Sequence, residues 1–300
     1  MDRFCGRPRA AGRRPHVVGL ARSDESAAAL ASAGADVQEG TIDDLDVLQQ
    51  TAGASDGVIH LAFKHDLAFT GDFAGAASAD RLAVETIGDA LAGTDRPFVI
   101  ASGVLGLTPG RVATEEDGLG NDSGLGVFGE GPSARLATAR YTTSLASRSV
   151  RSSVLRLPPT VHGRGDTGFV ASLVGLARAH GEAGYLGDGG NRWPAVHRTD
   201  AARLFRLALE QAPAGSTLHG IGEEGVPLGD VAAEIGRQLG LPVRAVPADE
   251  AEDHFLWLAS FVALDSPASS VTTRALLDWQ PTGAGLLDDL STGRYTDGPA

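Results

Sequence analysis

Short apolar runs alternate with helix-like segments along most of this chain, beginning at His16. The runs are rich in Val, Ile, Leu and Ala, and the segments between them carry apolar residues at helical spacing. Strands that alternate with helices predict an α/β fold built on a parallel sheet. In this first part of the chain we expect strands at residues 17–20, 35–40 and 56–62, and helices at 24–33 and from 43 onwards.

The alternation continues to the end of the chain with one long interruption. Residues 103–130 are rich in glycine and lack periodicity, so we expect a long loop there. Asp200 is expected to cap one later helix, and Gly240, followed by Pro242, should end another. The other expected strands are 97–102, 150–157, a strand–turn–strand over 185–200 and 218–221; the other expected helices are 78–91, 132–148, 168–180, 201–210 and 227–239.

Residues 1–15 break this pattern. They contain two prolines and five arginines, whereas a buried parallel strand is a near-continuous apolar run. We expect an atypical, disordered segment: one interpretation is a basic arm, and the one we favour is a frame error or misplaced start. The glycine-rich turn that usually begins a nucleotide-binding unit is missing before His16. The sheet should therefore lack its first central strand, and a dinucleotide should bind weakly if at all.

The net negative charge of the chain argues against two classes of binding partner. The net charge is −13 over 300 residues, whereas nucleic acids and anionic membranes need a basic surface. No apolar run approaches the length of about 18–20 residues that a membrane span needs. The single cysteine, Cys5, excludes an internal disulfide framework and a cysteine-based zinc site. We expect a cytoplasmic protein with a small-molecule substrate, no nucleic-acid or membrane partner and no metal site.

The end of the first expected strand holds a candidate cofactor contact. In a dinucleotide-binding sheet, an acidic residue at such a strand end binds the ribose 2′-hydroxyl, whereas an arginine accommodates a 2′-phosphate. Here the residues are Arg22 and Ser23, which favours NADP, with NAD as the alternative. The structural interpretation is a solvated Arg22 in a turn, with Ser23 or Asp24 capping the next helix.

Several segments occur in an order and spacing that resemble one known family. They are residues 58–62, 99–102 with Gly106, 155–158 with His162 and Gly163, 186–189 with Val196, His197 and Asp200, and 273–281. Over roughly residues 16–294 the chain resembles the extended short-chain dehydrogenase/reductase superfamily, in its NAD-dependent epimerase/dehydratase family. The resemblance implies a Rossmann-like, doubly wound parallel sheet in residues 16–160, to which some later strands return, and a smaller C-terminal substrate lobe in residues 161–300.

The resemblance also implies a catalytic pair that this sequence lacks. In that family a tyrosine and a lysine four residues later share a helix face, and the lysine lowers the pKa of the phenol that exchanges a proton with the substrate. Lys64 is the only lysine of the chain, and His60 stands four residues before it. The positions that match the pair are Gly131 and Arg135. An arginine can hold a ribose hydroxyl, but it is not a proton source at neutral pH.

Two residues remain as candidates for catalysis. Ser102 lies within one residue of the family's catalytic Ser/Thr position, with Ala101 as the other match, and would polarise a substrate oxygen. Arg135 would take the place of the lysine. The residues assigned to cofactor binding are Arg22, Ser23, Thr41, Ile42, His60, Leu61, Ala62 and Pro158. Those assigned to the substrate are Lys64, His162, Trp193 and His197, among which a histidine near neutral pKa could replace the missing tyrosine.

Simpler structural roles compete with several of these assignments. His197 and Asp200 are the residues that would fix a turn between the two lobes. His60 would anchor the backbone with its ring beside the cofactor. Lys64 would be a solvated loop residue.

Two functions therefore follow from the sequence. The first is an NAD(P)-dependent oxidoreductase or epimerase-like protein acting on a small carbonyl, hydroxyl or sugar-like substrate. The second is a catalytically inactive NAD(P)-binding sensor or degenerate paralogue, which the missing tyrosine and lysine favour. By analogy with related proteins we also expect a homodimer.

Overall fold

The central element of the molecule is a parallel sheet of four strands. The computed structural model describes residues 15–119 and 130–295, and the strands of this sheet lie in the order β3-β4-β5-β9. β4 (Pro97–Gly103) and β5 (Arg151–Leu157) pair along their whole length. β3 (Val58–His60) and β9 (Ser216–His219) lie at its two edges.

The remaining elements alternate along the chain around this sheet. The other strands are β1 (Val18–Ala21), β2 (Asp36–Glu39), β6 (Thr160–His162), β7 (Ala183–Leu186), β8 (Arg192–His197), β10 (Glu223–Pro227) and β11 (Val243–Val246). The α-helices are α1 (Asp24–Ser32), α2 (Leu45–Ala54), α3 (His65–Phe69), α4 (Phe73–Leu91), α5 (Glu130–Ser144), α6 (Phe169–His180), α7 (Arg198–Gln211), α8 (Leu228–Leu239), α9 (Ala251–Phe255), α10 (Ala259–Val262), α11 (Val271–Leu277) and α12 (Leu286–Ser291).

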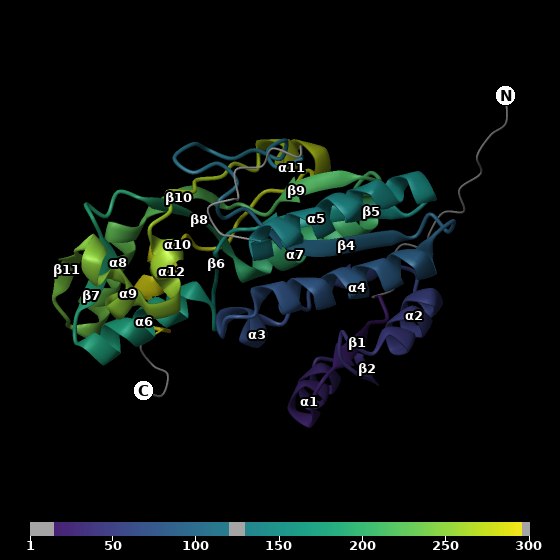
Figure 1. The fold of residues 1–300 in the computed structure, drawn as a ribbon, viewed down its shortest axis with the longest axis horizontal. Coiled ribbons are helices and arrows are strands. Elements are labelled where there is room, and N and C mark those ends of the chain that lie inside the picture. Colours follow the sequence, from purple (N-terminus) through teal and green to yellow (C-terminus); the bar gives the residue numbers. More distant parts are fainter. Residues whose placement is uncertain (1–14, 120–129, 296–300) are drawn as a thin grey trace.

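Helices cover both faces of the main sheet, as a doubly wound fold requires (Figure 1). Successive side chains of a strand point to opposite faces. Phe98 and Ile100 of β4 pack with residues of α2, α4 and α5, whereas Val99 between them packs with residues of α7 and α11. The predicted fold class, a Rossmann-like α/β sheet with a smaller C-terminal lobe, is confirmed.

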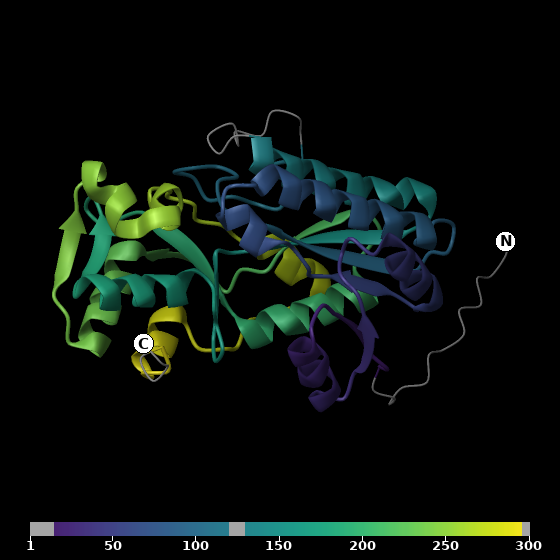
Figure 2. The same ribbon diagram turned by 60° about the horizontal axis from the view of Figure 1, so that its bottom comes forward.

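The second lobe lies at one end of the main sheet (Figures 1 and 2). It contains a three-stranded sheet in the order β10-β8-β6 and the two-stranded sheet β11-β7. Trp193 and Phe255 are buried in its core, against residues of α6 and α8. α7, β9 and α11 return to the first lobe, so the chain crosses between the lobes several times. Within the described residues, no helix combines the length and the apolar character needed to cross a membrane.

Helix ends show where the sequence was informative. Ser23 caps α1, and Gly240 ends α8 in the left-handed conformation at φ 66°, as predicted. The predicted cap by Asp200 is wrong: the His197 side chain caps α7 by accepting a hydrogen bond from the Thr199 amide. β6, β10 and β11 were not expected, because each is short and pairs only through the tertiary structure.

β1 and β2 form a separate ribbon that does not join the main sheet. They pair only with each other, from Val18 opposite Asp36 to Ala21 opposite Glu39. Figures 1 and 2 show this ribbon and α1 set apart from the four-stranded sheet. The sheet of the described residues is thus interrupted between β1 and β3, where the sequence predicts that a central strand is missing. The expectation of disorder at residues 1–15 falls almost entirely on residues 1–14, which lie outside the described residues.

The interruption leaves apolar side chains in contact with water. Val17 and Val18 are 51% and 43% exposed. Because neighbouring side chains in extended backbone point to opposite faces, both faces are uncovered at this point. Ile59 and Leu61 are 37% and 59% exposed, although the apolar run at residues 58–62 is typical of a buried strand, so burial of the whole run is a wrong expectation. Helix α1 has no buried residue that could shield them. An unpaired strand edge with apolar side chains is a template for association with another chain.

Lysine substitutions at the two uncovered strands should therefore suppress self-association. We expect the wild-type chain to associate as its concentration rises, and Val18→Lys and Leu61→Lys to stay monomeric over the same range in light scattering. Because both side chains are exposed, unfolding free energies should change by no more than about 0.5 kcal/mol. Val271→Lys, at a 69% exposed position on α11, is the matched control and should associate like the wild type. Equal association of all variants would contradict the prediction.

Candidate functional site

The carboxyl ends of β3 and β4 lie side by side, which is where parallel sheets bind ligands. His60 is opposite Ile100 in the pairing of these strands, so Ser102 lies two residues further along β4. Val58 and Ile100 pack in the core beneath α2, α4 and α5. His60 and Ser102 have the same parity as these two residues and therefore face the same helices.

His60 is held by a carboxylate from α4. Its Nε2 lies 2.9 Å from Asp80 Oδ1, and the two side chains are only 7% and 6% exposed. This side-chain partner replaces the backbone anchor that we expected for His60. Sequence reasoning missed Asp80, although an acidic residue in the otherwise apolar stripe of a helix was a usable signal, because a buried charge needs a partner. The stripe consists of Ala76, Ala77, Ala83, Val84 and Ile87.

Arg135 brings a positive charge to the end of β4. Its guanidinium lies over the Phe63 ring, with Cζ 4.1 Å from the ring centroid, and Nη2 donates a hydrogen bond to the Ala101 carbonyl at 3.2 Å. Burial lowers the pKa of Arg135, against the opposing influence of the Asp80 charge, but an arginine remains charged near neutrality. His65 packs edge-on against Phe63, and burial together with the Arg135 charge lowers the pKa of its imidazole.

Ser102 completes this group on β4. Its side chain is 9% exposed, and its backbone pairs with Arg156 of β5. Among the described residues, no side chain or backbone group hydrogen-bonds the Ser102 hydroxyl. The hydroxyl is thus available to a ligand. We call His60, Phe63, Asp80, Ser102 and Arg135 the strand-end cluster.

The residues assigned to the adenosine side follow β1 and β2. Ser23 is committed to capping α1, where it accepts a hydrogen bond from the Ser26 amide. Arg22 and Asp66 form an exposed ion pair at 3.4 Å. Thr41 donates through its amide and its hydroxyl to the Asp44 carboxylate, at 2.7 and 2.9 Å, and so forms the turn before α2.

The other residues assigned to the cofactor differ in exposure. Ile42 is 7% exposed and belongs to the core beneath α4. Leu61 and Ala62 follow β3 and are exposed, whereas Pro158 follows β5 and is buried. Contact of these residues with a dinucleotide stays a prediction.

The middle of a dinucleotide does not fit the described residues. A pyrophosphate rests on backbone N–H groups of a glycine-rich turn and the helix that follows it. That turn would follow a strand between β1 and β3, and the sheet of the described residues is interrupted there. The phosphate-binding part of a cofactor site is thus missing from this part of the chain.

The residues assigned to the substrate lie in different places. Lys64 Nζ is 2.6 Å from Asp43 Oδ2, which joins the loop after β3 to the start of α2. Trp193 is fully buried beside Phe169 in the core of the second lobe, so its side chain is not on a cavity wall.

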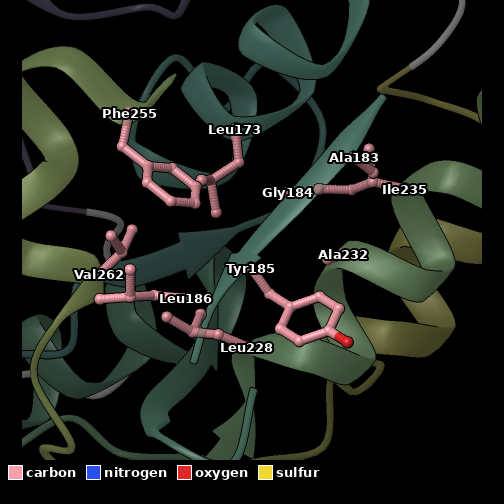
Figure 3. Close-up of a pocket in the computed structure, with 10 residues that line it drawn as sticks. All are labelled: Leu173, Ala183, Gly184, Tyr185, Leu186, Leu228, Ala232, Ile235, Phe255 and Val262. Carbon is pink, nitrogen blue, oxygen red and sulfur yellow. The ribbon is translucent and has the colours of Figure 1, made fainter. Parts of the chain in front are cut away.

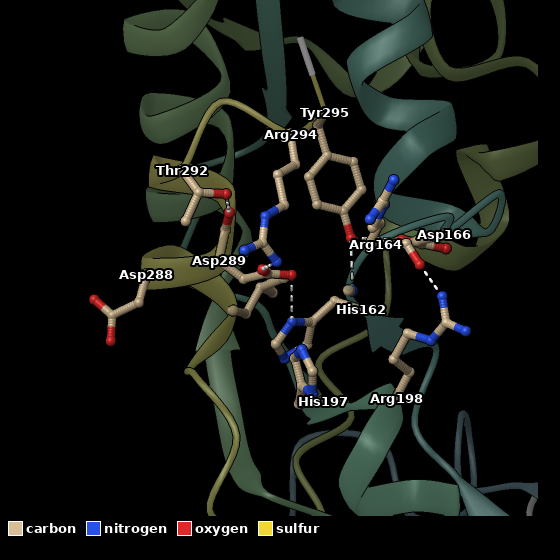
Figure 4. Close-up of polar contacts among 12 residues, drawn as sticks. His162, Arg164, Asp166, His197, Arg198, Asp288, Asp289, Thr292, Arg294 and Tyr295 are labelled. Carbon is tan, nitrogen blue, oxygen red and sulfur yellow. Dashed lines mark hydrogen bonds and ion pairs between the residues drawn. The ribbon is translucent and has the colours of Figure 1, made fainter. Parts of the chain in front are cut away.

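His162 and His197 lie together where the lobes meet (Figure 4). Their rings pack edge-on, with centroids 5.4 Å apart. His162 is buried, and its Nδ1 lies 3.1 Å from Asp289 Oδ2 of α12. Tyr295 donates to Asp166 at 2.8 Å and accepts from the Gly163 amide, so the segment after α12 is bonded to the loop after β6.

Asp200 supports the structural interpretation of this junction. Its carboxylate accepts hydrogen bonds from the amides of Thr282 and Gly283 at 2.9 and 2.7 Å. Its backbone carbonyl accepts from the Trp279 indole. These bonds fix the crossing between the lobes, as the simpler interpretation of His197 and Asp200 expects.

The enclosed cavity of the second lobe is too small for a substrate. It measures about 20 Å³, and its wall is mostly apolar and includes Tyr185 and Phe255 (Figure 3). A volume of this size holds about one water molecule. A more open groove of about 460 Å³ beside Glu115 and Arg140 contains no residue of the strand-end cluster. Among the described residues, no group of three side chains is placed to hold a metal ion.

A second buried polar group lies at the carboxyl ends of β5 and β9, where Arg156 and His219 are register partners. Arg156 is 2% exposed and donates to the Asp117 carbonyl at 2.6 Å, with His219 Nε2 3.4 Å away. The His219 Nδ1 donates to the Ser269 carbonyl at 2.8 Å. Burial, together with the Arg156 charge, lowers the pKa of His219 to about 4. This group joins the loop after β4 to the segment before α11.

Comparison with known proteins assigns the chain to a family. The sequence model of the NAD dependent epimerase/dehydratase family matches residues 7–219. The chain belongs to this family. It is 43% identical over 280 residues to an uncharacterised protein of Schizosaccharomyces pombe, with 93% of this chain and 91% of that protein covered. An uncharacterised protein of Saccharomyces cerevisiae is also 43% identical, over 276 residues, with coverages of 91% and 89%.

Solved structures of sugar-nucleotide enzymes share the fold of this epimerase/dehydratase family member. A UDP-glucose 4-epimerase of Thermotoga maritima superimposes with a TM-score of 0.69 at 16% identity, over 94% of this chain and 90% of the enzyme. A dTDP-glucose 4,6-dehydratase of Streptomyces venezuelae, solved with NAD, gives a TM-score of 0.72 at 18% identity, over 93% and 87%. At these identities the likeness shows the fold alone.

The buried imidazole of His219 should make this family member acid-sensitive. The pKa is about 4 in the folded chain and about 6.5 in an unfolded one, so the unfolded state binds more protons between these values. Stability should therefore fall as pH decreases from about 6.5 towards 4, by on the order of 3 kcal/mol for this group. In urea unfolding at several pH values, His219→Gln should lose less stability than the wild type over this range.

The control for this experiment is His16→Gln, at an exposed histidine. It should keep the pH dependence of the wild type. An unchanged pH dependence in His219→Gln would show that the buried imidazole does not control acid stability.

Proposed function

We propose that this epimerase/dehydratase family member is an NAD(P)-dependent oxidoreductase or epimerase-like protein that acts on a small organic substrate at the strand-end cluster. The substrate carries a carbonyl or hydroxyl group, as simple carbonyl compounds and sugars do. One observation carries the proposal: Ser102, Arg135 and the His60–Asp80 pair converge on one face at the carboxyl ends of β3 and β4.

In this proposal the residues of the strand-end cluster have different roles. The Ser102 hydroxyl donates a hydrogen bond to the substrate oxygen, and Arg135 orients the substrate rather than supplying a proton. A nicotinamide cofactor supplies or accepts hydride when bound. Because the described residues lack the phosphate-binding turn, we expect weak cofactor binding, and we assign no further step to the cofactor.

The cofactor preference is part of the proposal. Arg22 at the end of β1 is 70% exposed and free to exchange Asp66 for a 2′-phosphate, which supports NADP over NAD. A cytoplasmic location and a homodimer also remain predictions.

A cofactor-binding protein without turnover is the second candidate. The specific observation that favours it is the absence of a tyrosine and lysine pair, with Arg135 at the position that matches the lysine. Such a protein would bind the dinucleotide and leave it unchanged in the presence of carbonyl compounds.

Removal of the Ser102 hydroxyl tests the enzymatic proposal. With NADPH and a panel of aldehydes, ketones and oxo acids, Ser102→Ala should lose turnover by about tenfold or more, because it removes a polarising donor. The decrease in nicotinamide absorbance measures the rate. Ser147→Ala, at an exposed serine, should match the wild type. Full activity of Ser102→Ala would contradict the role of Ser102, and cofactor binding without oxidation across the panel would favour the second candidate.

Cofactor titrations followed by tryptophan fluorescence test the role of Arg22. NADPH should bind several-fold more tightly than NADH, and Arg22→Ala should remove this difference, because it removes a charge-assisted contact to the 2′-phosphate. Arg206→Ala, at a solvent-exposed ion pair on α7, should keep the preference. Equal binding of the two cofactors by the wild type would contradict the role of Arg22. No binding of either one would contradict both candidate functions.

A further inference from the structure

We propose that Arg135 binds a carboxylate group of the substrate, and that the substrate class is a small 2-oxo or 2-hydroxy carboxylate. The inference rests on the proposed function, because it concerns the same strand-end cluster and names its substrate class. It concerns a contact that forms without the cofactor, so it can be tested separately.

The Arg135 guanidinium is held in place before any ligand arrives. The Phe63 ring supports one face of the guanidinium plane, with 4.1 Å between Cζ and the ring centroid. The Nη2 bond to the Ala101 carbonyl, at 3.2 Å, fixes one edge of the plane. Phe63 itself packs against Phe73 of α4, with 5.7 Å between ring centroids, so the supporting ring is also held. A fixed guanidinium loses little conformational entropy when it binds an anion.

Most donors of this guanidinium remain available. A guanidinium has five N–H groups in a planar fork, and the Ala101 carbonyl takes one of them. Among the ion pairs between side chains that the structure describes, none involves Arg135. The neighbouring acid, Asp80, directs Oδ1 to His60 at 2.9 Å instead. Arg135 is partly buried, and charges that are removed from water are paired in most proteins.

The charge balance favours an anion with a single charge. Asp80 is close enough to raise the pKa of Arg135, so its negative charge offsets part of the arginine's positive charge. A phosphate dianion would meet one cation and one nearby carboxylate. A carboxylate is a monoanion whose two oxygens match two N–H groups of an arginine.

The position of Ser102 narrows the class further. Arg135 bonds the carbonyl of Ala101, and Ser102 is the next residue, with its hydroxyl free among the described residues. In a 2-oxo or 2-hydroxy acid the reacting oxygen is on the carbon next to the carboxylate. Such a molecule can therefore meet Arg135 with one end and Ser102 with the other.

Binding of pyruvate without cofactor tests the proposal. In a thermal unfolding assay, millimolar pyruvate should raise the unfolding midpoint of the wild-type chain in a saturable way. Pyruvamide, which has the same shape without the charge, should have no effect. Arg135→Gln should weaken pyruvate binding by about tenfold or more, because a charge-assisted pair is lost. Arg135→Lys should show intermediate affinity, because lysine keeps the charge without the planar fork.

Arg81→Gln is the matched control. Arg81 lies on α4 and pairs with Glu85, and its Cζ lies 4.0 Å from the centroid of the Tyr141 ring. Like Arg135→Gln, this variant therefore removes an arginine that is stacked on an aromatic ring. This variant should bind pyruvate like the wild type. If Arg135→Gln does not fold, Arg135→Lys decides, and unchanged affinity in that variant overturns the proposal.

Three other results would also overturn the proposal. They are the absence of saturable pyruvate binding by the wild type, equal binding of pyruvamide, and unchanged pyruvate binding by Arg135→Gln. Cofactor titrations distinguish this failure from failure of the proposed function. If pyruvate binds and no dinucleotide binds, the carboxylate site is supported and the oxidoreductase function is contradicted. If a dinucleotide binds and carbonyl compounds are reduced but pyruvate does not bind, the oxidoreductase function is supported and the carboxylate site is contradicted.

Discussion

The parallel pairing of β4 with β5 is the constraint on which the rest of the structure depends. Every residue of β4 has a partner in β5, from Pro97 opposite Arg151 to Gly103 opposite Leu157. The period of two along β4 then assigns Ile100 and Ser102 to the face under α4 and α5. A register shift of one residue would turn Ala101 to that face and Ser102 away from it. The sequence left these two residues as alternative matches, and the packing of β4 favours Ser102 as the residue near Arg135.

Several buried polar side chains bond to elements that are far apart in sequence. His60 bonds Asp80, Arg156 bonds the backbone of the loop after β4, and His162 bonds Asp289 of α12. Each of these bonds offsets the cost of burial and fixes one element against another. Arg135 differs because the neighbouring carboxylate of Asp80 directs one oxygen to His60 and forms no ion pair with the guanidinium. The same pairing that stabilises β3 against α4 thus leaves the guanidinium with donors to spare.

Local patterns in the sequence predicted the elements but not their partners. The apolar run at residues 97–102 and the glycine after α8 were sufficient to place β4 and a helix end, because strand burial and the left-handed conformation have direct residue signatures. Ser102 and Arg135 were found through the resemblance to a family. The apolar helix stripe around Asp80 was a local signal that this carboxylate is buried, but no local signal identified its partner, a histidine 20 residues away.

For Asp200, too, the sequence identified the residue but not its hydrogen-bond partners. The sequence correctly made it a residue of a helix start, but its carboxylate binds amides about 80 residues further along the chain. Leu61 illustrates a third case: its apolar neighbours predict a buried strand, and its exposure depends on a neighbouring strand that the described residues do not provide. The hydrogen-bond partner of a buried side chain, and the presence of a neighbouring strand, depend on the arrangement of the whole fold. A local sequence pattern therefore cannot predict them.

The interruption beside β3 separates two parts of the site that usually act together. The pyrophosphate of a dinucleotide depends on backbone groups between β1 and β3, and the described residues lack them. The strand-end cluster depends on β3, β4, α4 and α5, and from β1 and β2 only the partly buried side chain of Leu20 packs against the core that these elements share. The proposed substrate contacts can therefore be complete while the proposed cofactor contacts are not. It follows that weak dinucleotide binding, by itself, carries no information about whether Arg135 and Ser102 recognise a substrate.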